Sequence, residues 1–260
     1  MGFEVYACGT RGSFPSFGKE FSKYGQATSC YVIRDGDYAI VMDCGSGLVM
    51  AQKLLAGCRK VDVLLSHVHY DHVMGLFQHP QVCEGAEVTF YGNFTDWRKA
   101  EEETPDILYK IDELTACGER IAVEADRIYV LGKGFSVYFK PSNHGDGTMM
   151  IFIRKDGKRL CFTGDYEHSE ISKLVDWING FDVVLFDGSY TDNEYQKYRG
   201  WGHSSWEDGA RIALAAEVGL LIITHHSPGK TDEELQREER KLQEIMPNAF
   251  FIEEGTSIEL

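Results

Sequence analysis

The chain has 260 residues, 43% of them hydrophobic, and a formal net charge of −15 at pH 7. It is long enough to bury one large core. It shows neither an 18-residue apolar run nor a basic segment before an apolar stretch, so we expect no membrane span and no secretory signal.

The acidic charge balance also limits the partners. Long nucleic acids are bound by basic surfaces that release counterions, and the sequence has no run of Lys or Arg from which to build one. We therefore expect no long nucleic acid as partner. Small anions remain possible, because bound metal ions can supply the attracting charge.

The seven cysteines form no C-x-x-C pair. Cys44, Cys83 and Cys161 lie in or beside apolar stretches, where a reduced thiol acts as a small hydrophobic side chain. Because disulfides are rare in the cytosol, this usage predicts a cytoplasmic protein.

Strand-like and helix-like segments alternate along the chain. Apolar runs predict strands near residues 3–8, 28–34, 37–43, 61–66, 86–91, 127–131, 134–140, 148–154, 158–163, 182–187, 220–224 and 249–252. Helical spacing predicts helices near 47–56, 71–78, 94–103, 167–179, 204–217 and 231–245. Residues 101–126 are the least regular and are expected to form a surface excursion.

No repeat, linker or low-complexity segment interrupts this order, so we expect one domain over residues 1–260. Many strands with helices between them favour an α+β fold, a four-layered αββα sandwich. Helix ends are also predicted. One helix should stop at Gly180, and Ser204 with Glu207, like Thr231 with Glu234, has the spacing of a capping box.

A dense group of metal-binding side chains follows the apolar run at 61–65. His67, His69, Asp71 and His72 fall within six positions, between a predicted strand and a predicted helix. A tight turn at a strand end can direct several of them at one point. Imidazole suits zinc and other late first-row ions, and Asp adds an oxygen donor. The sequence therefore predicts a metal site here, in preference to a solvated turn with several histidines.

Three more polar residues follow strand-like runs in the same way: His144, Asp165 and His225. We expect them to reach the same edge of the fold as the first group. Five His and two Asp are enough for two ions, and a carboxylate can bridge them. Taken alone, His144 could be an exposed turn residue and Asp165 an ordinary turn aspartate.

Three other histidines have weaker support. His79 and His168 are expected at the surface. His226 either lines the pocket or packs away from it.

The H-x-H-x-D-H pattern resembles the metallo-β-lactamase superfamily, and the order of later motifs extends that resemblance over nearly the whole chain. The phosphodiesterase branch that includes ribonuclease Z is the most similar. The motifs concerned are Asp43-Cys44-Gly45-Ser46-Gly47, Thr163-Gly164-Asp165, Thr224-His225-His226-Ser227-Pro228 and Asp232-Glu233-Glu234-Leu235.

The resemblance implies a ligand set for two divalent ions. One ion would take His67, His69 and His144, Asp165 would bridge, and the other would take Asp71, His72 and His225. Zinc is the expected metal, with manganese or iron possible, because mixed nitrogen and oxygen ligands do not select sharply.

Two such ions can hold a hydroxide that attacks a phosphodiester. Trp201-Gly202-His203-Ser204 resembles the glycine-histidine-serine signature of ribonuclease Z, which implies that His203 is the general acid; Asp71 and His203 are the expected catalytic residues. The positive end of the following helix disfavours imidazolium. An acid role therefore requires a carboxylate such as Asp187, Asp192 or Glu207, or the substrate's charge. The alternative is a His that only packs at a helix entry.

The chain departs from ribonuclease Z in the segment that carries that enzyme's long arm for gripping transfer RNA. Only Gly145–Gly164 separate His144 from Asp165, enough for a hairpin. With the acidic balance, this favours a small phosphodiester. The arm-less form also resembles phage anti-Pycsar nucleases, which degrade cyclic mononucleotides. The hypothesis is a cyclic-nucleotide phosphodiesterase, and a homodimer is implied by resemblance only.

Other functions stay open. Ribonuclease Z-like RNA processing would need a partner that supplies the missing grip. Hydrolysis of a lactone, thioester or β-lactam uses the same metal ligands but has less need of His203. A non-catalytic metal-binding sensor is a further alternative. It is less favoured, because such a protein would have no chemical need for seven metal donors together with His203.

An aromatic segment lies just before His203. Its rings could stack on a nucleobase, form a small satellite core or make a dimer contact. Phe14 and Pro15 could add to the same rim. Gly9–Ser13 lack the spacing and the Lys of a P-loop, so we assign them no nucleotide role. The aromatic residues are Tyr190, Tyr195, Tyr198 and Trp201.

Overall fold

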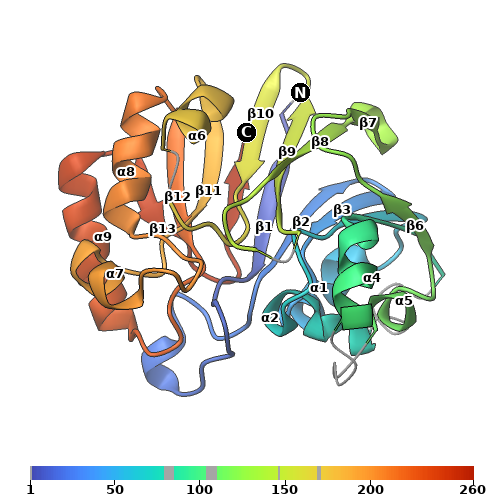
Figure 1. Cartoon of the computed structure of the whole chain (residues 1–260), viewed down its shortest axis with the longest axis horizontal. Helices are drawn as coiled ribbons and strands as arrows, with labels where there is room; N and C mark the ends of the chain where they lie inside the picture. The colour runs from blue at the N-terminus through green and yellow to red at the C-terminus, as the bar shows by residue number, and fades with distance from the viewer. Residues whose placement is uncertain (1, 79–84, 104–109, 146, 169–170) are drawn as a thin grey trace.

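Two β-sheets packed face to face, with helices on both outer sides, make up the computed structural model (Figure 1). It describes residues 2–78, 85–103, 110–145, 147–168 and 171–260. The predicted α+β fold of αββα type is confirmed. His79 and Cys83 lie outside the described residues.

The first sheet has the strand order β14-β1-β2-β3-β4-β5-β6 among the described residues. Its strands pair in antiparallel fashion from β14 to β3 and in parallel from β3 to β6. Their bounds are β1 Glu4–Gly9, β2 Cys30–Asp35, β3 Tyr38–Met42, β4 Lys60–Leu64, β5 Glu87–Gly92, β6 Glu119–Ala122 and β14 Ser257–Glu259.

The second sheet has the order β13-β12-β11-β10-β9-β8-β7 over the same described ranges. Strands β10 to β13 are parallel, so their carboxyl ends meet at one edge of the sandwich. The bounds are β7 Tyr129–Val130, β8 Ser136–Pro141, β9 Met149–Lys155, β10 Lys158–Phe162, β11 Val183–Asp187, β12 Leu220–Thr224 and β13 Ala249–Phe251.

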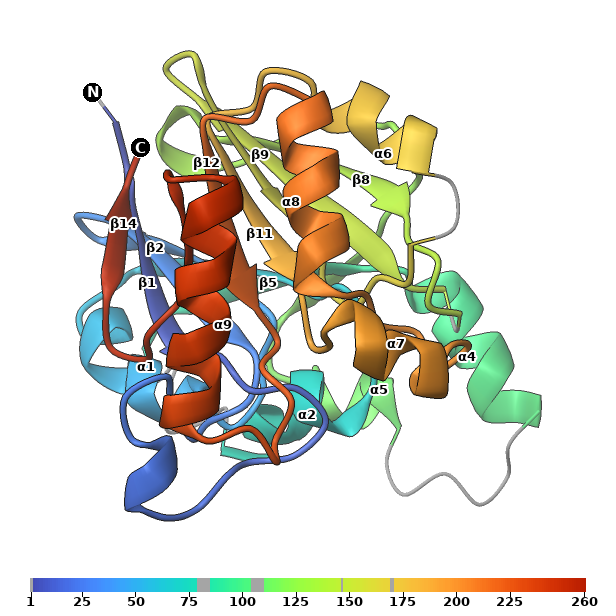
Figure 2. The same cartoon turned by 90° about the vertical axis from the view of Figure 1, so that its left-hand side faces the viewer.

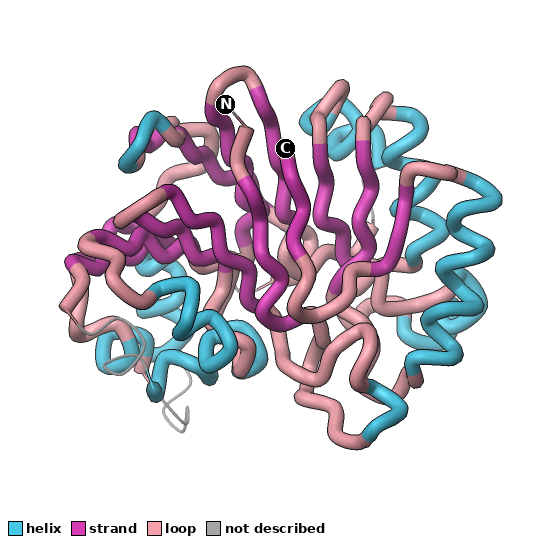
Figure 3. The backbone as a smooth tube through the Cα atoms, turned by 180° about the vertical axis from the view of Figure 1, so that it is seen from behind, coloured by secondary structure: helices cyan, strands magenta, loops and turns pink. Residues whose placement is uncertain are grey.

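Helices cover the outer face of each sheet. Figure 2 shows α8 and α9 lying across the second sheet, and Figure 3 shows helices flanking the strands on both sides. None of the described helices is both long and apolar enough to cross a membrane. The bounds are α1 Leu48–Leu55, α2 Tyr70–Val73, α4 Phe94–Glu103, α5 Ile111–Leu114, α6 Ile171–Ile178, α7 Asp192–Tyr198, α8 Trp206–Ala215 and α9 Asp232–Ile245, with 3-10 turns at Lys19–Phe21, Met74–Gln78 and Gly132–Gly134.

Three buried clusters fill the spaces between the four layers. Strand β11 shows how the pleat divides them. Val183 and Leu185 belong to the cluster between the sheets, whereas Val184 and Phe186 belong to the cluster under α6, α8 and α9. Side chains alternate across a strand, so a continuously apolar run serves two cores.

Several predicted elements differ from the structure. The excursion at 101–126 contains α5 and the edge strand β6, and the prediction missed both, as well as α7 and β14. These elements are short and lack the apolar periodicity of buried ones. The Thr231–Glu234 capping box is confirmed.

The predicted capping box at Ser204 and Glu207 is wrong. Helix α8 begins one residue later, with Ser205 as N-cap accepting from the Asp208 amide. Ser204 instead donates to the Tyr166 carbonyl, and its Oγ accepts from a neighbouring loop amide. Because its hydroxyl is bonded to residues 166–168, Ser204 does not cap α8.

Glu207 sits where α7, α8 and α9 meet. Its carboxylate accepts a hydrogen bond from the Asp192 amide at 3.0 Å. Burial, together with the negative charges of Asp192 and Glu238, raises the pKa of Glu207 to about 7. The carboxyl group is therefore easier to protonate in the folded protein than in the unfolded chain, where its pKa is near 4.5.

This raised pKa predicts a pH-dependent effect of Glu207→Gln. The folded state holds the proton more tightly, so the contribution of Glu207 to stability is full below pH 4.5 and is lost as the pH rises through about 7. We expect the variant to be more stable than the parent by about 2 kcal/mol at pH 8.5 and to match it near pH 5. Urea denaturation at both pH values measures the difference. Equal effects at the two pH values would contradict the prediction.

Candidate metal centre

Loops that follow the carboxyl ends of strands bring the predicted ligands to one edge of the sandwich, below the strands in Figure 1. The parallel strands end side by side there, so residues far apart in sequence meet. His67 to His72 follow β4, and Asp165 and His225 follow β10 and β12; His144 lies in the turn between β8 and β9.

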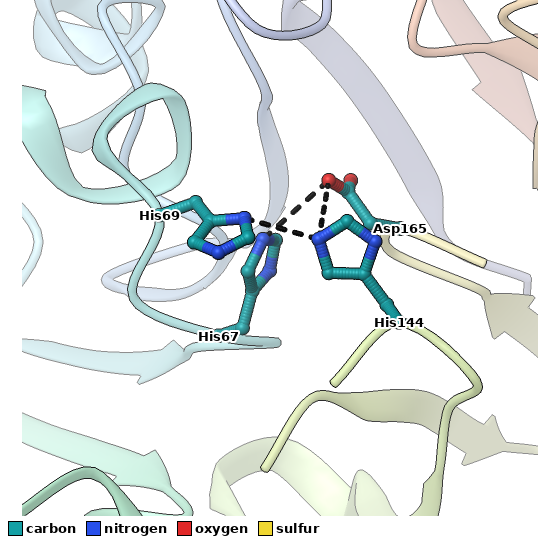
Figure 4. A group of neighbouring side chains, drawn as sticks. All are labelled: His67, His69, His144 and Asp165. Carbon is teal, nitrogen blue, oxygen red and sulfur yellow. Dashed lines mark hydrogen bonds and ion pairs between the residues drawn. The ribbon is translucent and has the colours of Figure 1, made fainter. Parts of the chain in front are cut away.

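Four of these side chains form a first group: His67, His69, His144 and Asp165 (Figure 4). His144 Nε2 lies 3.0 Å from His69 Nδ1 and 3.5 Å from Asp165 Oδ2. His67 Nε2 lies 3.4 Å from the same carboxylate oxygen. One oxygen of Asp165 and three imidazole nitrogens therefore face a common point.

The second group contains Asp71, His72, Asp165 and His225. Asp165 Oδ1 lies 3.0 Å from His72 Nε2 and 3.1 Å from His225 Nε2. Asp71 Oδ2 lies 3.2 and 3.3 Å from the same two nitrogens. Asp165 belongs to both groups through different oxygens, as a bridging carboxylate would.

The donor set fits two divalent cations. Candidate ligand atoms within each group all lie within 4.8 Å of one another. The buried His67 Nε2 and Asp165 Oδ1 form no hydrogen bond of good geometry. The atoms that face them are those of other candidate ligands, an arrangement that a cation would complete. Two imidazole nitrogens, His72 Nε2 and His225 Nε2, face each other at 3.4 Å. Imidazole and carboxylate together suit zinc and its first-row neighbours.

The electrostatics of the centre favour positive charge. Burial lowers the pKa of His67 well below its ordinary value, so its imidazole is neutral, the form that binds metal. Burial also disfavours a charged His72, but Asp165, Asp71 and Asp43 outweigh it and raise the pKa of His72 well above its ordinary value. Several carboxylates thus stabilise a cation at this point.

A second layer of polar groups fixes the candidate ligands. Asp43, at the end of β3, accepts hydrogen bonds from the amide and hydroxyl of Ser66 and lies 2.6 Å from His72 Nδ1. Ser189 Oγ lies 2.9 Å from His225 Nδ1. Such partners set the tautomer and orientation of a ligating imidazole.

Backbone geometry shows how tightly the centre is built. Asp43 and His225 both adopt left-handed φ values, 57° and 58°, which non-glycine residues rarely do outside constrained sites. A Cβ on Gly12 would lie 2.2 Å from the ring of His225. The backbone amide of the next residue, Ser13, donates to Asp71 Oδ2 at 2.7 Å. The glycine-rich loop after β1 therefore packs directly against the second group.

His203 lies beside the centre and is paired with Asp187. Its Nδ1 is 2.8 Å from Asp187 Oδ2 and 3.9 Å from Asp165 Oδ2. Burial opposes protonation, but the Asp187 carboxylate outweighs it and raises the pKa of His203 to about 9. Of the three carboxylates considered from the sequence, Asp187 is the partner: Asp192 accepts from Ser205 and Arg211, and Glu207 from an amide of α7.

A buried carboxylate, Glu167, holds the loop that carries His203. Glu167 accepts hydrogen bonds from the amides of Gly200 and Gly202 and from the Tyr195 hydroxyl. The Gly202 carbonyl in turn lies 2.7 Å from His144 Nδ1. One loop thus orients both His203 and a candidate ligand.

Sequence reasoning left the roles of Asp43, Asp187 and Glu167 incomplete. Asp43 and Asp187 each lie at the end of a strand-like run, the same signal that selected Asp165, so the sequence held a sign of both. Glu167 follows no such run, and no sequence signal marked it.

The structure also places the other histidines. His168 is not a surface residue as predicted: its side chain is largely buried and pairs with Asp208 at 2.8 Å. His226 packs away from the centre, with its ring stacked on Phe251 and Nε2 2.8 Å from the Ile252 carbonyl.

The sequence profile of the beta-lactamase superfamily domain matches residues 38–226, well over half of the chain. The chain belongs to the beta-lactamase superfamily. It is a metal-dependent hydrolase of that superfamily, as the sequence predicted.

Relatives agree with this assignment. Ribonuclease Z of Saccharolobus solfataricus is 25% identical over 255 residues, covering 78% of this chain and 83% of that protein. The probable metallo-hydrolase YhfI of Bacillus subtilis is 25% identical, covering 85% and 86%. The crystal structure of YhfI superposes with a TM-score of 0.78 at 21% identity, covering 100% and 99% of the two chains. A diphosphatase from the PhnP family shares the fold, with a TM-score of 0.73 at 16% identity over 100% and 98%.

The shared carboxylate predicts how metal content responds to mutation. Asp165→Ala removes a donor from both groups, so we expect the variant to lose both ions. His69→Ala removes a donor from one group only and should leave the other ion bound. Elemental analysis after gel filtration measures the metal per chain, with about two ions expected for the parent protein. Equal metal content in Asp165→Ala and the parent would contradict a bridging role.

Proposed function

We propose that the protein is a dinuclear metal-dependent phosphodiesterase that hydrolyses a small phosphodiester, a cyclic nucleotide. Zinc is the proposed metal, with manganese or iron as alternatives. One ion would be held by His67, His69 and His144 and the other by Asp71, His72 and His225, and Asp165 would contribute to both sites. The observation that carries the proposal is the His203–Asp187 pair beside this centre.

The chemistry needs a nucleophile, charge neutralisation and a proton for the leaving group. Two bound divalent ions would activate water and neutralise the phosphate's negative charge. Water adds to phosphorus, the bond from phosphorus to the ester oxygen breaks, and that oxygen takes a proton. His203 supplies this proton from Nε2, because Asp187 holds its Nδ1. Asp71, whose carboxylate accepts a hydrogen bond from the Ser13 amide, would be a ligand of the second ion.

The presence of a proton donor for the leaving group favours a phosphodiester over the other substrates that the same set of metal ligands could hydrolyse. Expulsion of an alkoxide from phosphorus benefits from an acid placed beside the metals, and His203 lies 3.9 Å from Asp165. The buried Asp187 carboxylate favours the protonated form of His203 and raises its pKa against the effect of burial. Relatives named ribonuclease Z support phosphodiester hydrolysis.

The hairpin of β9 and β10 supports a compact substrate. The two strands pair from Lys155 and Lys158 inward and are joined by Asp156-Gly157 alone. The residues described between His144 and Asp165, which are all but residue 146, form no extended arm. The net charge of −15 also disfavours a long polyanion. A cytoplasmic location and a homodimer remain predictions.

The role of His203 predicts a specific kinetic defect. His203→Ala removes the proton donor but none of the proposed ligands, so we expect turnover to fall by roughly 10²–10⁴-fold. Metal content should stay at the parent value. Steady-state kinetics with bis(p-nitrophenyl) phosphate, together with elemental analysis, test this. Unchanged turnover would remove His203 from the mechanism.

A substrate panel tests the proposed function itself. We expect the zinc- or manganese-loaded protein to hydrolyse bis(p-nitrophenyl) phosphate and at least one cyclic mononucleotide. It should be inactive on nitrocefin and a homoserine lactone. Cleavage of precursor transfer RNA in place of cyclic nucleotides would support ribonuclease Z-like processing. Failure on every phosphodiester, with fewer than two ions bound, would favour a non-catalytic sensor.

A further inference from the structure

Exposed aromatic side chains lie on the chain segments that form the candidate metal centre. Among the described residues, every exposed Phe, Tyr or Trp lies on a segment that also carries a residue of the centre. One pair lies in the loop that contains Ser13, one on α2 and the 3-10 turn that follows it, and one just before His203. These residues are Phe14, Phe17, Tyr70, Phe77, Tyr198 and Trp201.

The pair before His203 belongs to a continuous stack. The ring of Tyr190 lies 6.0 Å from that of His203, edge to face, and stacks on Tyr198 at 5.0 Å. Trp201 meets Tyr198 edge to face at 5.3 Å and is 66% exposed. A row of rings therefore leads from the proposed acid to the surface. Tyr195 does not belong to it, because it is buried and donates its hydroxyl to Glu167.

The backbone around these rings is fixed. Tyr190 bonds through its amide to the Ser204 carbonyl and through its carbonyl to the Trp206 amide. The Trp201 amide bonds to the Tyr198 carbonyl at 3.0 Å, and Glu167 holds the glycines on either side of Trp201. A platform that is already ordered loses little conformational entropy when a planar ligand binds.

We propose that Tyr198 and Trp201 form the subsite for the base of the substrate, which makes the substrate a nucleotide and not a phosphodiester without an aromatic ring. This inference rests on the proposed phosphodiesterase function. The row of rings ends at His203, so a base stacked on its outer part leaves the phosphate directed toward the centre. Stacking is open to every base because each has a π-face, and no charged group is needed.

Matched substrates and variants test the subsite. We compare a cyclic mononucleotide with a cyclic phosphodiester of glycerol, which lacks a base, in Tyr198→Ala, Trp201→Ala and Trp201→Phe. Phe17→Ala is the control, because Phe17 is 80% exposed but outside the stack. We expect Trp201→Ala to raise KM for the cyclic nucleotide by about ten-fold, the size of one base–aromatic contact. Trp201→Phe should keep KM for the cyclic nucleotide close to the parent value, because it retains an aromatic ring. The kinetic constants with the glycerol ester should not change in any of these variants.

Three outcomes would overturn the subsite. Equal losses with both substrates would mean that the rings only support the loop of His203. No change in KM, or an equal change in Phe17→Ala, would place the base elsewhere. A lower oligomeric state of Trp201→Ala in light scattering would assign the rings to a subunit interface.

A binding measurement separates this inference from the proposed function. Nucleoside monophosphate should quench the fluorescence of the parent, and Trp201→Phe should lose most of that quenching. The other tryptophans are less exposed than Trp201, and two of them, Trp97 and Trp206, are fully buried. Quenching without any phosphodiesterase activity would keep the subsite and reject the proposed reaction. Activity on the glycerol ester without quenching would support the proposed reaction and reject the subsite.

Discussion

The centre depends on one buried carboxylate, Asp165, that faces several imidazoles at once. Its two oxygens lie 3.0 to 3.5 Å from nitrogens of His67, His72, His144 and His225. Burial opposes the charged form, but the facing imidazoles hold the pKa of Asp165 well below its ordinary value. A buried carboxylate that faces imidazole nitrogens is stable only if a proton or a metal ion between them supplies positive charge. The rest of the site is arranged around that requirement.

The fold meets this requirement by joining two sheets at one edge. Asp43 and the His67–His72 turn come from the first sheet, and Asp165, Asp187 and His225 come from the carboxyl ends of parallel strands in the second. The apolar cluster between the sheets fixes their distance. Strained backbone at Asp43 and His225 is the local consequence, since the surrounding packing determines those conformations.

The polar groups around the candidate ligands are connected to one another. Asp43 and Ser189 hold the imidazoles of His72 and His225. Asp187 pairs with His203 and also accepts a hydrogen bond from Ser189. Glu167 belongs to the same network, because the loop it holds reaches His144 through a carbonyl and carries His203 and the exposed aromatic rings. A change in that loop would therefore disturb a candidate ligand, His203 and the exposed rings together.

The sequence by itself predicted the long buried strands and the αββα order, because each strand is a local apolar run. It also marked candidate ligands as polar residues near the ends of such runs, but it left His144 and Asp165 open, and their assignment depended on the resemblance to a known family. It did not determine that Asp187 is the partner of His203, that Ser205 in place of Ser204 caps α8, or that His168 is largely buried and paired with Asp208. These facts depend on which loops meet in space. Hydrogen-bond partners across tens of residues leave no periodic signal, so only the tertiary structure decides them.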